Sequence, residues 1–275
     1  MSASPALDTP LTRLLGCRYP ILQAGMGGVA RAELVAAVVT NGGYGFLGMV
    51  RENPETIVRE SNAVRECTDR PFGVNLIPAG TDPILLQEEL AACFDSKVHS
   101  LCFFWEVRPD LICQARRAGC RVLYQVGSIA DAIAAEQAGA QAVIAQGVEA
   151  GGHVRGSVSS LVPLPQVVAA VSAPVVASGG FASGASLVAA LALGAQGIHC
   201  GTVFLATRES FAHQYHKQRI IEARSENTVY TDIFAINWPP HAPVRVLNNS
   251  VTRHHAGPLL GHGPDDFPRE VRTRK

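Results

Sequence analysis

Residues 174–204 read PVVASGGFASGASLVAALALGAQGIHCGTVF and contain one complete strand–helix–strand unit. The apolar runs at 174–180 and 197–204 do not alternate with polar residues, as is typical of strands covered on both faces of a parallel sheet. Between them, an apolar helical pattern begins near Ser183 and ends at Gly194, where glycine supplies the left-handed backbone that closes a helix. This segment predicts a parallel βαβ unit.

The same unit recurs along the chain. Two further helical patterns end in Ala118-Gly119-Cys120 and Ala138-Gly139-Ala140, each directly before an apolar run. Eight such units in about 205 residues predict a closed (β/α)₈ barrel, or TIM barrel, with an open doubly wound sheet as the alternative. The strands are predicted at 20–24, 44–49, 72–77, 100–104, 121–126, 142–147, 174–180 and 197–204.

The chain divides into three predicted parts. Residues 1–205 form the barrel, and 206–251 form a small C-terminal lid segment. The lid is expected to have one helix at 210–223, followed by an irregular stretch that contains a Trp-Pro-Pro sequence. Residues 252–275 are rich in His, Gly, Pro and charge, and are predicted to be a disordered tail. The last barrel helix is expected to be missing.

Composition excludes several classes of function. The 23 basic residues balance 23 acidic ones, so no net charge favours nucleic acid or a membrane surface as a partner. Seven cysteines, an odd number with no Cys-x-x-Cys pair, argue against a disulfide framework or a zinc site and favour a reducing cytoplasm. Short apolar runs broken by glycine argue against a membrane-spanning helix, and the first residues lack the long apolar region that a secretory signal would need, so none is expected.

Glycines lie at the ends of the seventh and eighth predicted strands, in Ser178-Gly179-Gly180 and Gly201-Thr202. In α/β barrels the active site lies at the carboxyl ends of the strands, and phosphates favour the loops after strands seven and eight. Glycine removes the Cβ that would block a phosphate, and backbone N–H groups at a helix start act as donors. Each pair alone is typical of a turn. Both together predict a phosphate site, to which Thr202 adds a hydroxyl.

The loop Glu149-Ala-Gly-Gly-His153 follows the sixth predicted strand. Its two glycines allow the backbone to approach a flat ligand closely and place an imidazole beside it. Histidine is the usual side chain for proton transfer near neutral pH, so His153 is the candidate catalytic residue. The alternative is an ordinary loop histidine held by hydrogen bonds.

A competing motif follows the first predicted strand. Gly25-x-Gly27-x-x-Ala30 formally matches a dinucleotide-binding fingerprint, and Glu52 stands roughly where the ribose-binding acid would lie. This pattern does not explain the glycines after strands six, seven and eight, so the barrel interpretation is favoured.

Polar residues within apolar runs complete the candidate site. Asn75 and Gln125 are expected to be buried, which is costly unless their amides bond the backbone or a ligand. His213 and His216 share a helix face without an acidic or thiol partner, so no metal site is predicted. Cys200 is interpreted as a small buried filler and not as a nucleophile.

These segments together resemble the nitronate monooxygenase family, over roughly residues 10–250. The matching stretches include Pro20-Ile-Leu-Gln-Ala-Gly-Met26, Pro71-Phe-Gly-Val-Asn75 and Glu149-Ala-Gly-Gly-His153, of which the last is the most specific. Pro174-Val-Val-Ala-Ser-Gly-Gly180 and Cys200-Gly-Thr-Val-Phe-Leu-Ala-Thr-Arg-Glu-Ser210 continue the match. The resemblance implies a TIM barrel that binds FMN and uses O₂ to oxidise alkyl nitronates to carbonyl compounds and nitrite.

The resemblance also assigns roles to residues. His153 would face the substrate beside the flavin, as a base or as a hydrogen-bond donor to the nitronate. The flavin would be lined by Ala24, Gly25, Met26, Asn75, Gln125 and Gly151, and its phosphate and ribityl chain would be held by Ser178, Gly179, Gly180, Gly201 and Thr202.

The expected partners are O₂ and a small nitronate such as propionate-3-nitronate, and a homodimer is left open. Two other functions remain as alternatives. The first is an FMN-dependent enoyl-acyl-carrier-protein reductase, whose barrel shares the glycine loops and the histidine. The second is a shortened barrel that binds flavin without turnover.

Overall fold

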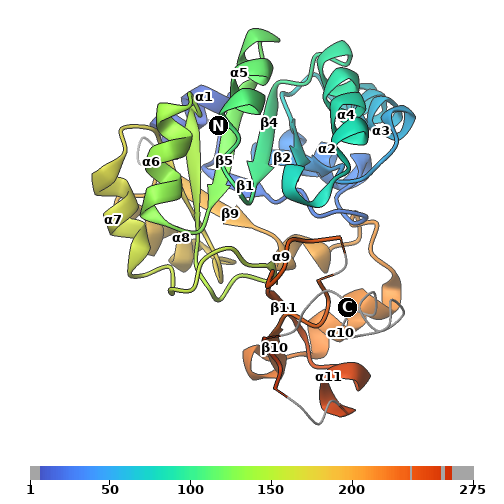
Figure 1. The fold of residues 1–275 in the computed structure, drawn as a ribbon. Helices are drawn as coiled ribbons and strands as arrows, with labels where there is room; N and C mark the ends of the chain where they lie inside the picture. Colours follow the sequence, from blue (N-terminus) through green and yellow to red (C-terminus); the bar gives the residue numbers. More distant parts are fainter. Residues whose placement is uncertain (1–6, 236, 255–257, 262–275) are drawn as a thin grey trace.

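The computed structural model describes residues 7–235, 237–254 and 258–261, and its central feature is a closed barrel of eight parallel strands (Figure 1). The barrel closes where Leu22 of the first strand pairs with His199 of the last. The predicted TIM barrel is therefore confirmed, and the doubly wound alternative is wrong. Around the barrel the strands are β1 (Ile21–Gln23), β2 (Tyr44–Gly48), β3 (Gly73–Leu76), β4 (Ser100–Phe104), β5 (Arg121–Val126), β6 (Ala142–Gln146), β8 (Val175–Ser178) and β9 (Gly197–Cys200).

Several helices between the strands begin at a capping serine or end at a glycine. The Ser128 and Ser183 side chains accept hydrogen bonds from backbone N–H groups three residues later and so cap their helices. Gly119, Gly139 and Gly194 have φ of 86°, 103° and 90°, the left-handed region that ends a helix. The barrel helices are α2 (Ala32–Thr40), α3 (Pro54–Cys67), α4 (Pro83–Asp95), α5 (Pro109–Arg117), α6 (Ile129–Gln137), α7 (Pro163–Ala170) and α8 (Gly184–Ala192), with a 3₁₀ turn η2 (Pro78–Gly80) after β3.

The amino-terminal end of the barrel is closed by α1 (Pro10–Leu15). Leu11 and Leu15 stand one turn apart on this helix, are fully buried and pack among the side chains inside the barrel. Figure 1 shows α1 at the end of the barrel opposite the carboxy-terminal segment. The hydrophobic plug leaves the carboxyl ends of the strands as the end at which a site can open.

Several strands are shorter than predicted. Pro20 and Pro174 lie just before β1 and β8, because proline lacks the N–H that a strand ladder needs. The eighth strand was expected to reach residue 204 but ends at Cys200, and α9 (Thr202–Leu205) follows it. The helix predicted at 210–223 is shorter, because α10 (Gln214–Glu222) starts only where the His213 side chain caps it.

The lid segment contains a small sheet that the sequence analysis missed. Antiparallel strands β10 (Thr228–Thr231) and β11 (Val244–Leu247) lie within the stretch expected to be irregular. β11 also pairs with β7 (Gly152–His153), which lies in the loop after β6. Thr-Val-Tyr-Thr and Val-Arg-Val-Leu are rich in β-formers and were the available signal. The lid is therefore hydrogen-bonded to the glycine-rich loop that contains the candidate histidine.

The remaining carboxy-terminal elements complete the described lid. They are the 3₁₀ turn η3 (Ser225–Asn227) and α11 (Ser250–His254), so residues 252–254 of the expected disordered tail are helical. The carbonyl of Leu259 accepts hydrogen bonds from Thr231 Oγ1 and the Asp232 N–H. The rest of the predicted tail, 255–257 and 262–275, lies outside the described residues. Among the described elements, the four-residue α9 is the helix that directly follows β9.

No helix in the described part of the chain is long and apolar enough to cross a membrane.

We predict that Leu15→Ala lowers the free energy of unfolding by about 2–5 kcal/mol, because the plug loses a buried side chain and a cavity remains. Urea titration of the variant measures this loss. Ile84→Ala is the matched control, since Ile84 is 74% exposed on α4 and its truncation leaves no cavity. Equal losses in the two variants would contradict the role of α1 as the barrel plug.

Candidate active site

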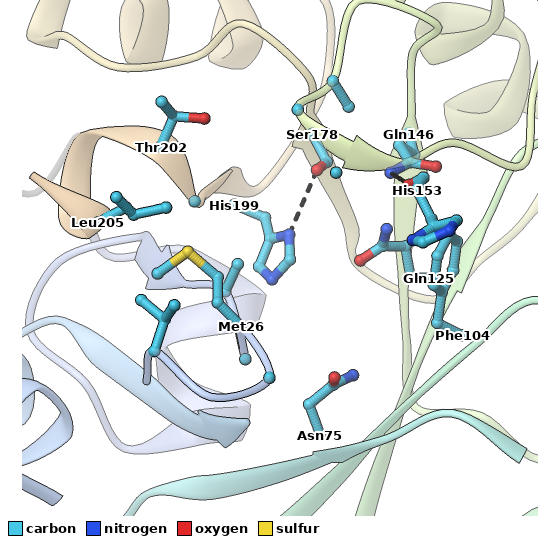
Figure 2. Close-up of a pocket in the computed structure, with 18 of the residues that line it drawn as sticks. Met26, Asn75, Phe104, Gln125, Gln146, His153, Ser178, His199, Thr202 and Leu205 are labelled. Atoms are coloured by element: carbon cyan, nitrogen blue, oxygen red, sulfur yellow. Dashed lines mark hydrogen bonds between the residues drawn. The ribbon is translucent and has the colours of Figure 1, made fainter. Parts of the chain in front are cut away.

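A cavity of about 790 Å³ opens at the carboxyl ends of the barrel strands (Figure 2). All twelve residues that the sequence analysis selected line it, so the structure brings the whole candidate set together. They are Ala24, Gly25, Met26, Asn75, Gln125, Gly151, His153, Ser178, Gly179, Gly180, Gly201 and Thr202. Their separate roles stay predictions.

Three glycine-rich turns meet on one side of this cavity. Gly179 and Gly180, after β8, have φ of 110° and 72°, which favours glycine at both positions. A Cβ on Gly151 would lie 2.9 Å from the Thr202 hydroxyl oxygen, so the turns after β6 and β9 are in close contact. The turns at Gly151, Gly179–Gly180 and Gly201 thus form a glycine cradle, in which the lack of side chains leaves room for a ligand.

The turn after β1 packs tightly against β3. A Cβ on Gly25 would lie 2.2 Å from Asn75 Cβ, so this approach requires glycine. The Asn75 amide donates to the Cys102 carbonyl at 3.0 Å, which fixes its orientation toward the cavity. Glu52, the acid of the competing dinucleotide motif, instead forms an ion pair with Arg31 at 2.5 Å and does not line the cavity.

Two glutamines on neighbouring strands have different tasks. Gln146 uses both ends of its amide on the loop after β6, donating to the His153 carbonyl at 3.0 Å and accepting from the Arg155 N–H at 3.1 Å. The Gln125 side chain faces the cavity (Figure 2) and has no hydrogen-bond partner within the described part of the chain. A buried amide without such a partner is suited to bind a polar ligand.

His153 is held between the barrel and the lid. It is buried, and its backbone pairs with Val244 of β11. Its ring is stacked on Trp238 of the lid, with centroids 3.6 Å apart and an angle of 15° between the planes. The stack and the strand pairing restrict the imidazole to one position at the cavity wall, as a catalytic or binding residue requires.

An aromatic cluster extends this wall. Trp238 packs edge-on against Phe104 and Trp105, at centroid distances of 6.2 Å and 5.2 Å. The Trp105 backbone has φ of 91°, which is unfavourable for a bulky residue and must be held by its packing. Phe104 lines the cavity itself. Trp238 was not recognised, because its position in the site depends on a lid segment more than eighty residues from His153.

His199 is a second cavity histidine that the sequence analysis did not select. It points from β9 into the barrel, and its Nδ1 lies 3.2 Å from the Ser178 hydroxyl oxygen (Figure 2). Burial lowers the pKa of His199 from 6.5 to about 4, so the ring is neutral at neutral pH. A histidine inside an otherwise apolar strand was the available signal. The His199 ring forms a polar but uncharged floor of the cavity.

A reactive cysteine or a metal ion would each require a particular arrangement of the described residues. Burial raises the pKa of the Cys200 thiol to about 11, so it remains protonated, as expected of a buried filler. No group of three or more His, Cys, Asp or Glu is gathered for a metal ion anywhere in the described ranges.

Fold and cavity define a class: an α/β barrel whose carboxyl end has a glycine cradle beside a buried histidine. Comparison with known proteins gives the family. The nitronate monooxygenase family model matches residues 8–84 and 85–260. The chain belongs to this family and is an oxidoreductase.

Relatives within the family differ in their named activities. A probable nitronate monooxygenase of Staphylococcus haemolyticus is 34% identical over 83% of this chain and 76% of its own length. A hydroxy-methyl-oxo-octahydroindene-carboxyl-CoA dehydrogenase of Mycobacterium tuberculosis is 36% identical over 87% of this chain, which spans 66% of that relative.

Solved structures show the same range. FabK from Thermotoga maritima superposes with a TM-score of 0.83 at 35% identity, over 90% of this chain and 76% of its own. A nitroalkane oxidase from Streptomyces ansochromogenes gives a TM-score of 0.77 at 34% identity, over 86% of this chain and 78% of its own.

We predict that His199 makes the protein less stable in acid. Its lowered pKa means that, between about pH 6.5 and about pH 4, the unfolded chain binds a proton that the folded chain excludes, so the free energy of unfolding falls as the pH falls through this window. His99 acts in the same direction, because burial lowers its pKa to about 4. Glu89 acts in the opposite direction, because burial raises its pKa to about 7.

A variant isolates the His199 contribution. His199→Gln should reduce the pH slope of unfolding stability in this window by up to about 1.4 kcal/mol per pH unit, the value for one proton. Urea unfolding of cofactor-free protein at several pH values measures the slope. Val188→Ala, at an exposed position on α8, removes no titratable group; it is the control and should leave the slope unchanged. An unaltered slope in His199→Gln would show that this ring does not titrate as its burial requires.

Proposed function

We propose that the protein binds FMN in this cavity and uses O₂ to oxidise alkyl nitronates, such as propionate-3-nitronate, to carbonyl compounds and nitrite. The observation that carries the proposal is the immobilised His153 ring, stacked on Trp238 at the wall of a glycine cradle. The family and the two relatives named for nitronate or nitroalkane oxidation support it.

The cavity fits a flat phosphorylated cofactor. The Gly179–Gly180 and Gly201–Thr202 turns would hold the phosphate, because their backbone approach is free of side chains. The partnerless Gln125 amide and the oriented Asn75 amide would bond polar edges of the isoalloxazine ring. When bound, the flavin would accept electrons from the nitronate and pass them to O₂.

His153 would act on the substrate at the aromatic wall. A nitronate is already an electron-rich anion, so its oxidation needs no further removal of an α-proton, and the imidazole would donate a hydrogen bond to the nitro oxygens. For a neutral nitroalkane the same ring would have to act as the base. Trp238 and Phe104 would exclude water from one side and so strengthen these polar contacts.

Arg51 would favour an anionic substrate. It is the only lysine or arginine among the described residues that line the cavity. Its backbone has φ of 58°, and its guanidinium donates to the Gly80 carbonyl at 3.3 Å, which orients the side chain. A single positive charge in the lining of an otherwise uncharged cavity raises the local concentration of anions.

A second candidate is flavin-dependent chemistry on an acyl thioester, as in the enoyl-acyl-carrier-protein reductase that the sequence left open. A separate arginine-lined cavity adjoins the first and would suit a larger, phosphorylated substrate. Anaerobic mixing with propionate-3-nitronate and, separately, with NADH distinguishes the candidates. Flavin bleaching by the nitronate alone supports nitronate oxidation, whereas rapid bleaching by NADH alone supports the reductase. A flavoprotein inert to both would be a barrel without turnover.

We predict that the purified protein has an FMN absorption spectrum and that FMN stabilises it. FMN that binds only the folded state at about one hundred times its Kd should add about 2.7 kcal/mol to the free energy of unfolding. Thermal melting of stripped protein, with and without added FMN, measures this effect. A colourless protein whose melting temperature ignores FMN would exclude the proposal.

We predict that His153→Asn slows flavin reduction by nitronate about 10²- to 10⁴-fold, because the donor or base beside the substrate is lost. FMN affinity should change much less, since the glycine cradle is intact. Anaerobic stopped-flow and FMN titration measure the two effects. His213→Asn, outside the cavity, is the matched control and should match the wild type. Unchanged single-turnover reduction in His153→Asn would remove its chemical role.

A further inference from the structure

A second cavity, of about 660 Å³, lies under the lid. It extends between α10 and the sheet of β10, β11 and β7. Four of its lining residues, Gly151, Gly152, Thr202 and Leu205, also line the first cavity. Thr202 and Leu205 stand together on one side of the first cavity in Figure 2. The two cavities therefore adjoin along the glycine loop and α9.

The second cavity has a strongly positive lining. Arg219 of α10, Arg245 of β11 and Arg253 of α11 all contribute to it. Glu149 is the only acidic residue among its described lining residues. The Glu149 carboxylate accepts hydrogen bonds from the Ser160 N–H, at 3.1 Å, and from the Ser160 hydroxyl, so it is committed to its own loop. Three guanidinium groups thus share one cavity without an acidic partner there.

Arg245 is anchored to the loop and to the lid sheet by several contacts. Its terminal nitrogens donate to the Val148 carbonyl at 3.0 Å and to the Thr228 hydroxyl at 3.4 Å, and its guanidinium lies 5.3 Å from the Tyr230 ring centroid. The Arg245 Nε is fully buried and has no partner in the described ranges. The buried Asn249 Nδ2, in the same lining, is likewise without a described partner.

Strand register connects this cavity to the candidate chemistry. Arg245 pairs with Gly152, and the neighbouring Val244 pairs with His153. His153 lines the first cavity, whereas Gly152 lines both. A ligand that contacts Arg245 would therefore lie one residue along β7 from the imidazole, close enough for one molecule to extend through both cavities.

We propose that the second cavity binds the phosphate-bearing arm of a substrate or cosubstrate whose reactive end lies beside His153. Phosphate fits best because a pyrophosphate bridge carries two negative charges and a terminal phosphate monoester close to two more, and their oxygens match several planar guanidinium donors. Two kinds of molecule supply such an arm: a coenzyme A thioester and a nicotinamide dinucleotide. The proposal rests on the proposed flavin cavity only for where the reactive end lies.

Binding of defined probes to the FMN-loaded protein tests the proposal. Calorimetry should show that coenzyme A or NADH binds, that inorganic pyrophosphate competes with it, and that pantetheine, which lacks phosphate, binds at least about tenfold more weakly. Tighter binding of coenzyme A identifies the thioester source, and tighter binding of NADH identifies the dinucleotide source. Binding should weaken as salt rises, because the contacts are ionic.

Variants locate the site. Arg253→Gln and Arg219→Gln should each weaken binding of the phosphorylated probe about tenfold or more, while the lysine variants should recover part of it because charge is kept but bidentate geometry is lost. Arg224→Gln is the charge-matched control, since Arg224 is exposed and outside the cavity. FMN content and melting temperature report whether each variant folds.

Several results would overturn the proposal. The first is equal binding of pantetheine and coenzyme A together with no binding of NADH. The second is an equal loss of probe affinity in Arg224→Gln and in the two cavity variants. The third is a loss of FMN affinity in the cavity variants, which would place the flavin phosphate among these arginines. These outcomes are independent of nitronate turnover. A protein that binds coenzyme A but leaves nitronates unoxidised would contradict the proposed function and leave this inference standing.

Discussion

The short pairing of β7 with β11 is the constraint on which the arrangement of the site depends. Only two residue pairs form it, Val244 with His153 and Arg245 with Gly152. Through them the lid sheet holds the glycine loop, brings Trp238 onto the His153 ring and sets Arg245 beside Gly152. Two cavities that differ in the number of basic residues in their linings thus share one backbone segment. Gln146 secures the same loop from the barrel side, so the loop is fixed from both directions.

Charge is distributed unevenly across this segment. The first cavity has a neutral floor, because burial keeps His199 unprotonated, and Arg51 is the one lysine or arginine among its described lining residues. The second cavity concentrates three arginines. Such a division suits a molecule with an uncharged or weakly charged reactive end and a strongly anionic arm.

The barrel and the glycine loops could be predicted from the sequence because their causes are local. Unbroken apolar runs mark strands covered on both faces, and Gly179 and Gly180 mark a turn with positive φ. Once eight such units close a barrel, chain order alone brings their loops to one end. Trp238 and the β10–β11 sheet were missed because their places depend on contacts with a loop distant in sequence. His199 was missed, although a histidine inside an apolar strand was a local signal, because its role follows from the barrel interior that surrounds it.

The most direct test of the central claim, that the converging glycine turns hold a flavin beside His153, is a crystal structure of the protein grown with FMN. The account predicts the phosphate against Gly179, Gly180 and Thr202, with the ring system between Gln125 and the His153–Trp238 stack. An FMN phosphate bound elsewhere, or a cavity that excludes the flavin at saturating concentration, would contradict it.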